Sequence, residues 1–157
     1  MPPNPPLPAP PSDDPNVRLR RSFLAVIRDP EAFGELFYQR LFELAPPVRA
    51  MFPDDMKSQQ QKLVHAIAVL VRGLDQPQAM EPVLRLLGAR HVGYGVHAHQ
   101  YVVVGEALID TLDRVGDAPL DDATRQAWTQ LYGWVAATML AGAEEVLRTP
   151  PRRSAAA

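Results

Sequence analysis

Residues 86–101 have the sequence LLGARHVGYGVHAHQY and contain three of the four histidines of the chain. Leu84, Leu87 and His91 lie three and four residues apart, so on a helix their side chains share one face. A histidine at the end of an apolar stripe is either a hydrogen-bonded core residue or a ligand to a bound group. Spacing alone favours the core residue.

The glycines around this histidine complicate the core interpretation, without identifying what lies beside it. A glycine inside a helix costs about 1 kcal/mol relative to alanine, so we expect Gly88 and Gly93 to leave space for something flat and bulky. The remaining histidines do not form a set with chelate spacing. We expect His97 and His99 to face solvent or cap the next helix, and His65 to point away from the core.

The composition is typical of one globular domain. The 157 residues are 46% hydrophobic and 22% charged, and this is ordinary for a soluble protein. The net charge of −2 provides no basic field for nucleic acid or an anionic membrane. The absence of cysteine excludes disulfides and thiolate metal ligands. Without a signal peptide pattern or a membrane-length apolar run, we expect a cytoplasmic protein.

Proline placement divides the chain. Eight of the 17 prolines lie in the first fifteen residues, which predicts a disordered arm over 1–15, a folded domain over 16–148 and a disordered tail over 149–157. In the folded part, apolar residues repeat with a helical period in about seven segments, and no stretch is a convincing strand. The sequence therefore predicts an all-α domain.

Individual residues predict where some of these helices begin and end. Asp29 before Pro30 is typical of a helix start, Gly116 of a helix end, and Asp121 or Asp122 of the cap of the last helix. Enzyme motifs are absent, since there is no glycine-rich phosphate loop, no G-x-S-x-G and no H-E-x-x-H. A largely apolar pocket with one ligand residue is the more natural site.

Several segments, in order and at family spacing, resemble a bacterial single-domain globin, related to flavohaemoglobin haem domains and to animal neuroglobin. FYQRLFELAPPVRAMF (37–52) resembles the second helix, its proline corner and the phenylalanine that packs on haem. SQQQKLVHAIAVLVRGLD (58–75) resembles the distal helix, and LGARHVGYGV (87–96) the proximal segment. HQYVVVGEALIDTL (99–112) and AWTQLYGWVA (127–136) resemble the last two long helices. The resemblance implies the globin fold, a three-on-three helical sandwich around one haem b.

The resemblance also implies roles for individual residues. His91 would be the proximal ligand of the haem iron, and Tyr38 and Gln59 would be hydrogen-bond donors in the distal pocket, with Leu63 on its wall. The other haem-binding residues would be Phe52, stacked on the porphyrin, Leu87, Tyr94, Val96, Tyr101 and Val104, on the proximal side and haem edge, and Lys62 and Arg90, at the propionates.

The last helix departs from the flavohaemoglobin pattern. Those proteins use a glutamate and a tyrosine to hold the proximal histidine; here Tyr101 is at the tyrosine position, but Ala143 is at the glutamate position. Glu144 is one residue away, about 100° around the helix. We therefore expect His91 to donate to a backbone carbonyl near Leu87, which favours reversible O₂ binding over O–O cleavage.

The implied function is reversible binding of O₂, and of CO and NO, at ferrous iron, for oxygen storage or delivery by a monomer or weak homodimer. This interpretation leans away from an enzyme. One alternative is a nitric oxide dioxygenase with a separate reductase, since we expect no flavin domain in a chain of this length. Another is a haem gas sensor. Because the distal residue is not histidine, we expect five-coordinate ferrous iron that His65 does not bind.

Overall fold

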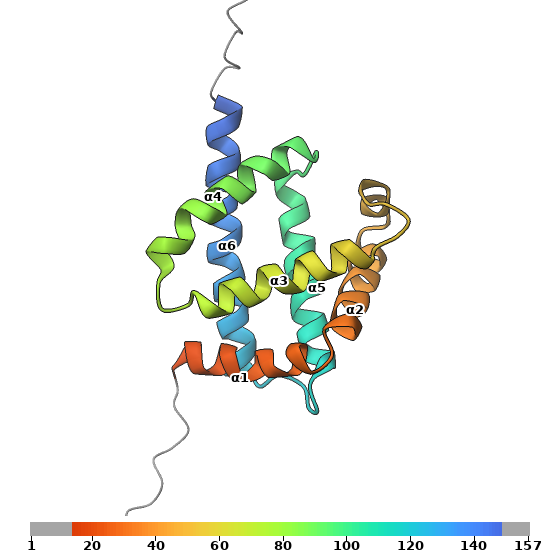
Figure 1. The fold of residues 1–157 in the computed structure, drawn as a ribbon, viewed down its shortest axis with the longest axis vertical. Helices are drawn as coiled ribbons and strands as arrows, with labels where there is room; N and C mark the ends of the chain where they lie inside the picture. The colour runs from red at the N-terminus through yellow and green to blue at the C-terminus, as the bar shows by residue number, and fades with distance from the viewer. Residues whose placement is uncertain (1–13, 149–157) are drawn as a thin grey trace, which may run out of the picture.

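The computed structural model describes residues 14–148 (Figure 1). In this range the chain forms six α-helices and one 3-10 helix, and no strand. They are α1 (Pro15–Arg28), α2 (Pro30–Leu44), η1 (Pro46–Met51), α3 (Lys57–Arg72), α4 (Pro77–Gly93), α5 (Ala98–Val115) and α6 (Asp122–Arg148). The predicted all-α class is confirmed. The predicted tail, and all of the predicted arm except its last two residues, lie outside the described residues; Pro15 is the first residue of α1.

Aspartates cap three of the helices. The carboxylate of Asp29 accepts a hydrogen bond from the backbone N–H of Ala32 at 3.0 Å, and that of Asp121 accepts one from Thr124 at 2.8 Å. Asp14 caps α1 in the same way. Each bond satisfies a backbone donor that the first turn of a helix leaves without a partner. The predicted start at Asp29 is therefore confirmed, and Asp121 rather than Asp122 caps the last helix.

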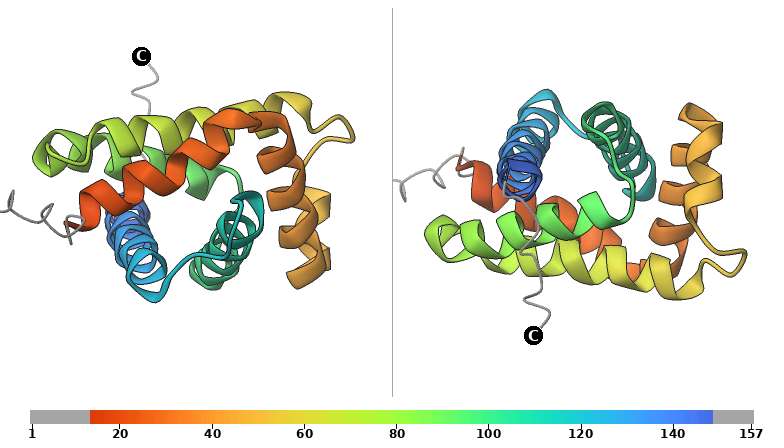
Figure 2. Two further views of the ribbon diagram at one scale, coloured as in Figure 1. Left: turned by 90° about the horizontal axis from the view of Figure 1, so that it is seen from below. Right: turned by 90° about the horizontal axis from the view of Figure 1, so that it is seen from above.

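The helices form two crossing layers (Figures 1 and 2). One layer contains α1, α3 and α4, and the other contains α2, α5 and α6. The most extensive contact is between α4 and α6, followed by that between α2 and α5, and α3 packs on α2 and α1. None of the described helices is long and apolar enough to cross a membrane.

The buried core consists of two clusters. The larger one lies between α1, α2, α3, α5 and the start of α6 and includes Phe33 and Trp128, which are 0% and 1% exposed. The smaller one consists of Leu84, Tyr101, Val135 and Met139, from α4, α5 and α6.

The apolar residues of α1 do not all face the core. Leu19, Phe23 and Val26 are buried, whereas Leu24 and Ile27 are each 56% exposed. The buried three form the face that packs on the larger cluster.

Candidate functional site

The imidazole of His91 is held by its own helix near the C-terminal end of α4. Its Nδ1 lies 2.7 Å from the backbone carbonyl oxygen of Leu87. A carbonyl only accepts, so Nδ1 carries the proton and Nε2 keeps a free lone pair. Within residues 14–148, Nε2 has no hydrogen-bond partner. The predicted acceptor is confirmed, and the arrangement is the one that metal-ligating histidines use.

No carboxylate in the described residues holds the His91 ring. Ala143 is buried in α6, and the exposed Glu144 pairs instead with Arg148 at 3.3 Å. The rings nearest to His91 are those of Tyr94 and Tyr101, with centroid distances of 5.5 and 6.5 Å. The surroundings of the His91 ring therefore include two aromatic rings and one backbone carbonyl.

Gly88 does not leave space for a ligand, and this prediction is wrong. A Cβ at Gly88 would lie 1.8 Å from the carbonyl oxygen of Met139, so the glycine faces the backbone of α6. Gly93 does face open space, with nothing within 4 Å of an added Cβ. The sequence shows that a glycine lacks a side chain, but it does not show which part of the fold packs against that glycine.

Tyr38 and Gln59 form a hydrogen-bonded pair between α2 and α3. The Gln59 amide Nε2 donates to the Tyr38 hydroxyl oxygen at 3.0 Å. Tyr38 is only 5% exposed, and burial raises the pKa of its hydroxyl while the Gln59 hydrogen bond lowers it. The phenol is therefore neutral at physiological pH, and its own proton remains available to another acceptor.

Aromatic rings surround the Tyr38 ring. The centroids of Phe37, Phe42 and Phe52 lie 4.9, 5.9 and 5.4 Å from that of Tyr38. The Phe37 and Phe52 rings meet it edge to face, the geometry that aromatic pairs prefer. Tyr38 and Phe52, two of the predicted site residues, thus lie together although they come from different elements.

Arg49 shapes the loop that carries Phe52, and the sequence analysis missed it. Its guanidinium donates to the backbone carbonyls of Phe52, Pro53 and Asp54 at 3.2, 2.9 and 3.3 Å. It also lies over the Phe42 ring, 5.2 Å from the centroid. A single arginine near the end of a short helix has no periodic signal, so only the folded loop reveals this role.

The remaining predicted residues are divided between the two core clusters. The half-buried Phe52, Leu63 and Val104 pack against the larger cluster. The half-buried Leu87 and Val96 pack against the smaller one, which includes Tyr101.

The three other predicted residues are exposed. They are Lys62 on α3, Arg90 on α4, and Tyr94, which is 66% exposed at the end of α4. In the described part of the chain, neither Lys62 nor Arg90 has an ion-pair partner.

This set of donors fits a haem. His91 provides one free imidazole nitrogen, and Tyr38 and Gln59 provide two neutral hydrogen-bond donors on α2 and α3. The two core clusters provide half-buried apolar side chains, and Lys62 and Arg90 are two cations at the surface. In Figure 1 the C-terminal end of α4 lies beside the upper end of α5, and α3 crosses α5 with its N-terminal end next to α2. The chemistry matches one axial ligand, a polar distal pocket and an apolar lining.

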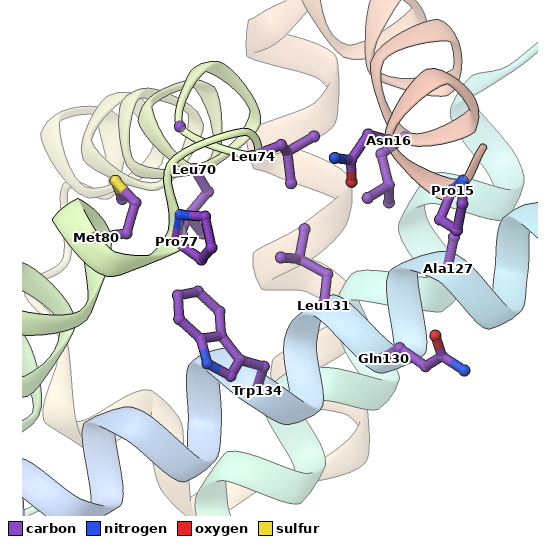
Figure 3. Close-up of a pocket in the computed structure, with 12 residues that line it drawn as sticks. Pro15, Asn16, Leu70, Leu74, Pro77, Met80, Ala127, Gln130, Leu131 and Trp134 are labelled. Atoms are coloured by element: carbon purple, nitrogen blue, oxygen red, sulfur yellow. The ribbon is translucent and has the colours of Figure 1, made fainter.

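Two cavities lie elsewhere in the described residues. One, of about 240 Å³, lies between α1, the α3–α4 corner and α6, where Trp134 and Leu131 face Leu74 and Met80 (Figure 3). The other is a hollow of about 720 Å³ between α2 and α3, beside Glu35. Neither is lined by a predicted site residue, so side-chain chemistry, not cavity size, defines the site.

Comparisons of sequence connect the chain to known proteins. The family model for Globin matches residues 35–139. The flavohemoprotein of Chromobacterium violaceum is 34% identical over 108 residues, which is 66% of this chain and 26% of that protein. The flavohemoprotein of Rhizobium meliloti is 34% identical over 115 residues, 71% of this chain and 28% of that protein. The chain thus spans less than a third of the length of these curated relatives.

Solved structures share the same fold. A bacterial globin from Campylobacter jejuni has a TM-score of 0.76 and 20% identity, over 88% of this chain and all of that one. An engineered carbene transferase from Rhodothermus marinus, provisionally assigned as a nitric oxide dioxygenase, has a TM-score of 0.74 and 27% identity, over 87% of this chain and 95% of that one. The helical fold and the matched residues agree, and the chain belongs to the globin family.

Proposed function

We propose that this protein binds haem b through Nε2 of His91 and reversibly binds a diatomic gas, with O₂ storage or delivery as its role. The observation that carries the proposal is the 2.7 Å contact between His91 Nδ1 and the Leu87 carbonyl oxygen, which leaves Nε2 as the ligand atom. When bound, the haem supplies an iron centre that coordinates small gases reversibly.

The Leu87 carbonyl holds the His91 ring in one orientation, with a proton on Nδ1. Because a carbonyl withdraws the Nδ1 proton less than a carboxylate does, the imidazole stays an ordinary nitrogen donor. Ala143 cannot supply a carboxylate, and Glu144 is engaged by Arg148. A donor of ordinary strength favours reversible gas binding over O–O cleavage.

The Tyr38 hydroxyl is the direct hydrogen-bond donor of the distal pocket. Gln59 donates its amide proton to the Tyr38 oxygen, so the phenol proton is free to point at the gas. Gln59 thereby holds Tyr38 in place instead of competing with it. The surrounding rings of Phe42 and Phe52 exclude water, and a hydrogen bond is electrostatically stronger where water is excluded.

The residues at the edge would hold the porphyrin. Lys62 and Arg90, which are exposed and without ion-pair partners in the described range, would pair with the two propionates. Leu63, Leu87, Tyr94, Val96, Tyr101 and Val104 would supply the apolar lining.

The test is the absorption spectrum of purified protein loaded with haem. We expect a five-coordinate ferrous spectrum that changes on addition of CO. His91→Ala should lose the iron–histidine spectrum and regain it with added imidazole, whereas His65→Ala should leave it unchanged because His65 is exposed. An unaltered spectrum in His91→Ala without imidazole would contradict the assignment, and a six-coordinate ferrous spectrum in the unmodified protein would contradict the distal pocket.

A second function, nitric oxide dioxygenase activity with a separate reductase, is favoured by the relatives. The matched sequences are named flavohemoproteins and are much longer than this chain, and the Rhodothermus marinus neighbour is provisionally assigned that activity. The discriminating measurement is sustained NO consumption with a reductase and an electron donor. Consumption that stops after one turnover would leave the storage role as the better description.

A further inference from the structure

Two glycines bring the backbones of α4 and α6 into direct contact where the helices cross (Figure 1). A Cβ at Gly88 would lie 1.8 Å from the carbonyl oxygen of Met139, and a Cβ at Gly142 would lie 2.0 Å from that of Arg85. Ordinary carbon–oxygen contacts are about 3.3 Å or longer. Because the obstacle is backbone in both cases, rotating a side chain cannot relieve it.

The contact is reciprocal. Arg85 and Gly88 are three residues apart on α4, and Met139 and Gly142 are three residues apart on α6. Arg85 meets Gly142 and Gly88 meets Met139, so the numbering rises along one helix as it falls along the other. Two such contacts fix the distance between the two helix axes. They also fix the position of α4 along the axis of α6.

This contact is the main support of α4. Among the described helices, α4 packs extensively only on α6. Pro82 inside α4 lacks the N–H of a helical hydrogen bond, which weakens the first half of the helix. Beyond His91 the chain passes Gly93, which has no neighbour within 4 Å of an added Cβ, and then Gly95, whose φ is +77°. The side chains of α4 also reach the domain through the smaller core cluster, so the α6 contact is the most extensive support of α4 and not its only one.

His91 is tied to the same contact through its neighbours. It lies three residues after Gly88, about 4.5 Å along the axis and 60° around the helix, so its side chain leaves α4 close to the line of contact with α6. The His91 ring is hydrogen-bonded to the carbonyl of Leu87, which adjoins Gly88. A shift of α4 against α6 therefore moves Nε2.

We propose that Gly88 and Gly142 are positioning residues that set where the His91 imidazole lies in the pocket. The proposal rests on the proposed ligation of haem iron by His91. A methyl group at either glycine requires the backbones to separate locally by at least about 1 Å. That displacement alters the geometry between imidazole and iron without touching any side chain of the distal pocket.

The test is resonance Raman spectroscopy of the ferrous, haem-loaded protein, with the iron–histidine stretching frequency as the readout. Gly142→Ala and Gly88→Ala should each shift this frequency. The matched control is Gly133→Ala on α6, since Gly133 has nothing within 4 Å of an added Cβ. This control should leave the frequency unchanged.

The same substitution in a second protein, His91→Gly, distinguishes an effect on the position of His91 from a general loss of structure. In His91→Gly protein with imidazole supplied from solution, the ligand is no longer attached to α4. Adding Gly142→Ala in that background should not shift the iron–imidazole frequency. A further control, Arg85→Ala, removes the ion pairs of Arg85 with Glu81 and Glu145, 3.4 and 3.6 Å long, but keeps the backbone contact, and should not shift the frequency.

Every outcome decides between the possibilities. Lowered thermal stability in both glycine variants with an unshifted frequency would make the contact merely structural and overturn the proposal. So would failure of both variants to fold while the controls fold. An unmodified protein without an iron–histidine band would instead refute haem ligation by His91, which is the proposed function itself.

Discussion

Replacing Tyr38 with phenylalanine removes one hydroxyl and leaves the aromatic packing around it in place. That hydroxyl accepts the Gln59 hydrogen bond at 3.0 Å and keeps its own proton for the pocket. In the proposed function Tyr38 would act on the gas directly, and Gln59 would act through Tyr38. We therefore expect Tyr38→Phe to accelerate O₂ dissociation more than Gln59→Leu does.

The magnitudes follow from the type of hydrogen bond lost. A bond to an acceptor that carries partial negative charge contributes about 1.5–3 kcal/mol, and a neutral bond about 1 kcal/mol. Since about 1.4 kcal/mol corresponds to a factor of ten, Tyr38→Phe should accelerate dissociation roughly 10- to 100-fold. Gln59→Leu loosens Tyr38 without removing the donor, so about a two- to fivefold effect is expected, within the energy of one neutral bond.

The assay is stopped-flow measurement of O₂ dissociation for the unmodified protein, both single variants and the double variant. The double variant should resemble Tyr38→Phe, because Gln59 has nothing left to position, and this non-additivity is the signature of coupled residues. His65→Ala on the exposed side of α3 is the control. A larger effect of Gln59→Leu than of Tyr38→Phe, or strictly additive effects, would refute the proposal that Tyr38 donates to the gas and that Gln59 only positions Tyr38.

Further changes test the fold around the site. Arg49→Ala removes three bonds to loop carbonyls and should lower the free energy of unfolding by roughly 1–2 kcal/mol in urea, whereas Arg21→Ala, at an exposed position, should not. Phe33→Ala at a fully buried site should cost about 3–5 kcal/mol, and Leu24→Ala, 56% exposed, less than about 0.5 kcal/mol. Burial raises the pKa of Tyr132 above its ordinary value of 10.0, so above pH 10 the unfolded chain loses a proton that the folded chain keeps. The free energy of unfolding should then fall as pH rises, and less steeply in Tyr132→Phe.

Local features of the sequence were enough to predict much of the fold. Asp29 before Pro30 and Gly116 mark helix ends because their chemistry acts within one turn, and the structure has α2 starting and α5 ending there. The His91–Leu87 hydrogen bond is local in the same sense, since its partners are four residues apart. Predictions of this kind need only the geometry of a single helix.

Features that depend on two elements meeting were harder to predict. Gly88 was expected to leave room for a ligand but instead meets the backbone of α6, and no periodicity in α4 contains that information. Arg49 acts on three carbonyls whose positions exist only in the folded loop. Ile27 fits a helical stripe yet is exposed, because the docking of α1 selects one edge of a broad apolar face.

The smaller core cluster contains only four buried side chains, from α4, α5 and α6. Segments with few buried apolar contacts open locally at lower cost than the whole domain unfolds. We therefore expect the amides around this cluster to exchange with solvent faster than those around the larger cluster. Since α4 and α6 meet backbone to backbone at Gly88 and Gly142, these parts of the two helices should exchange together, as one unit of local unfolding.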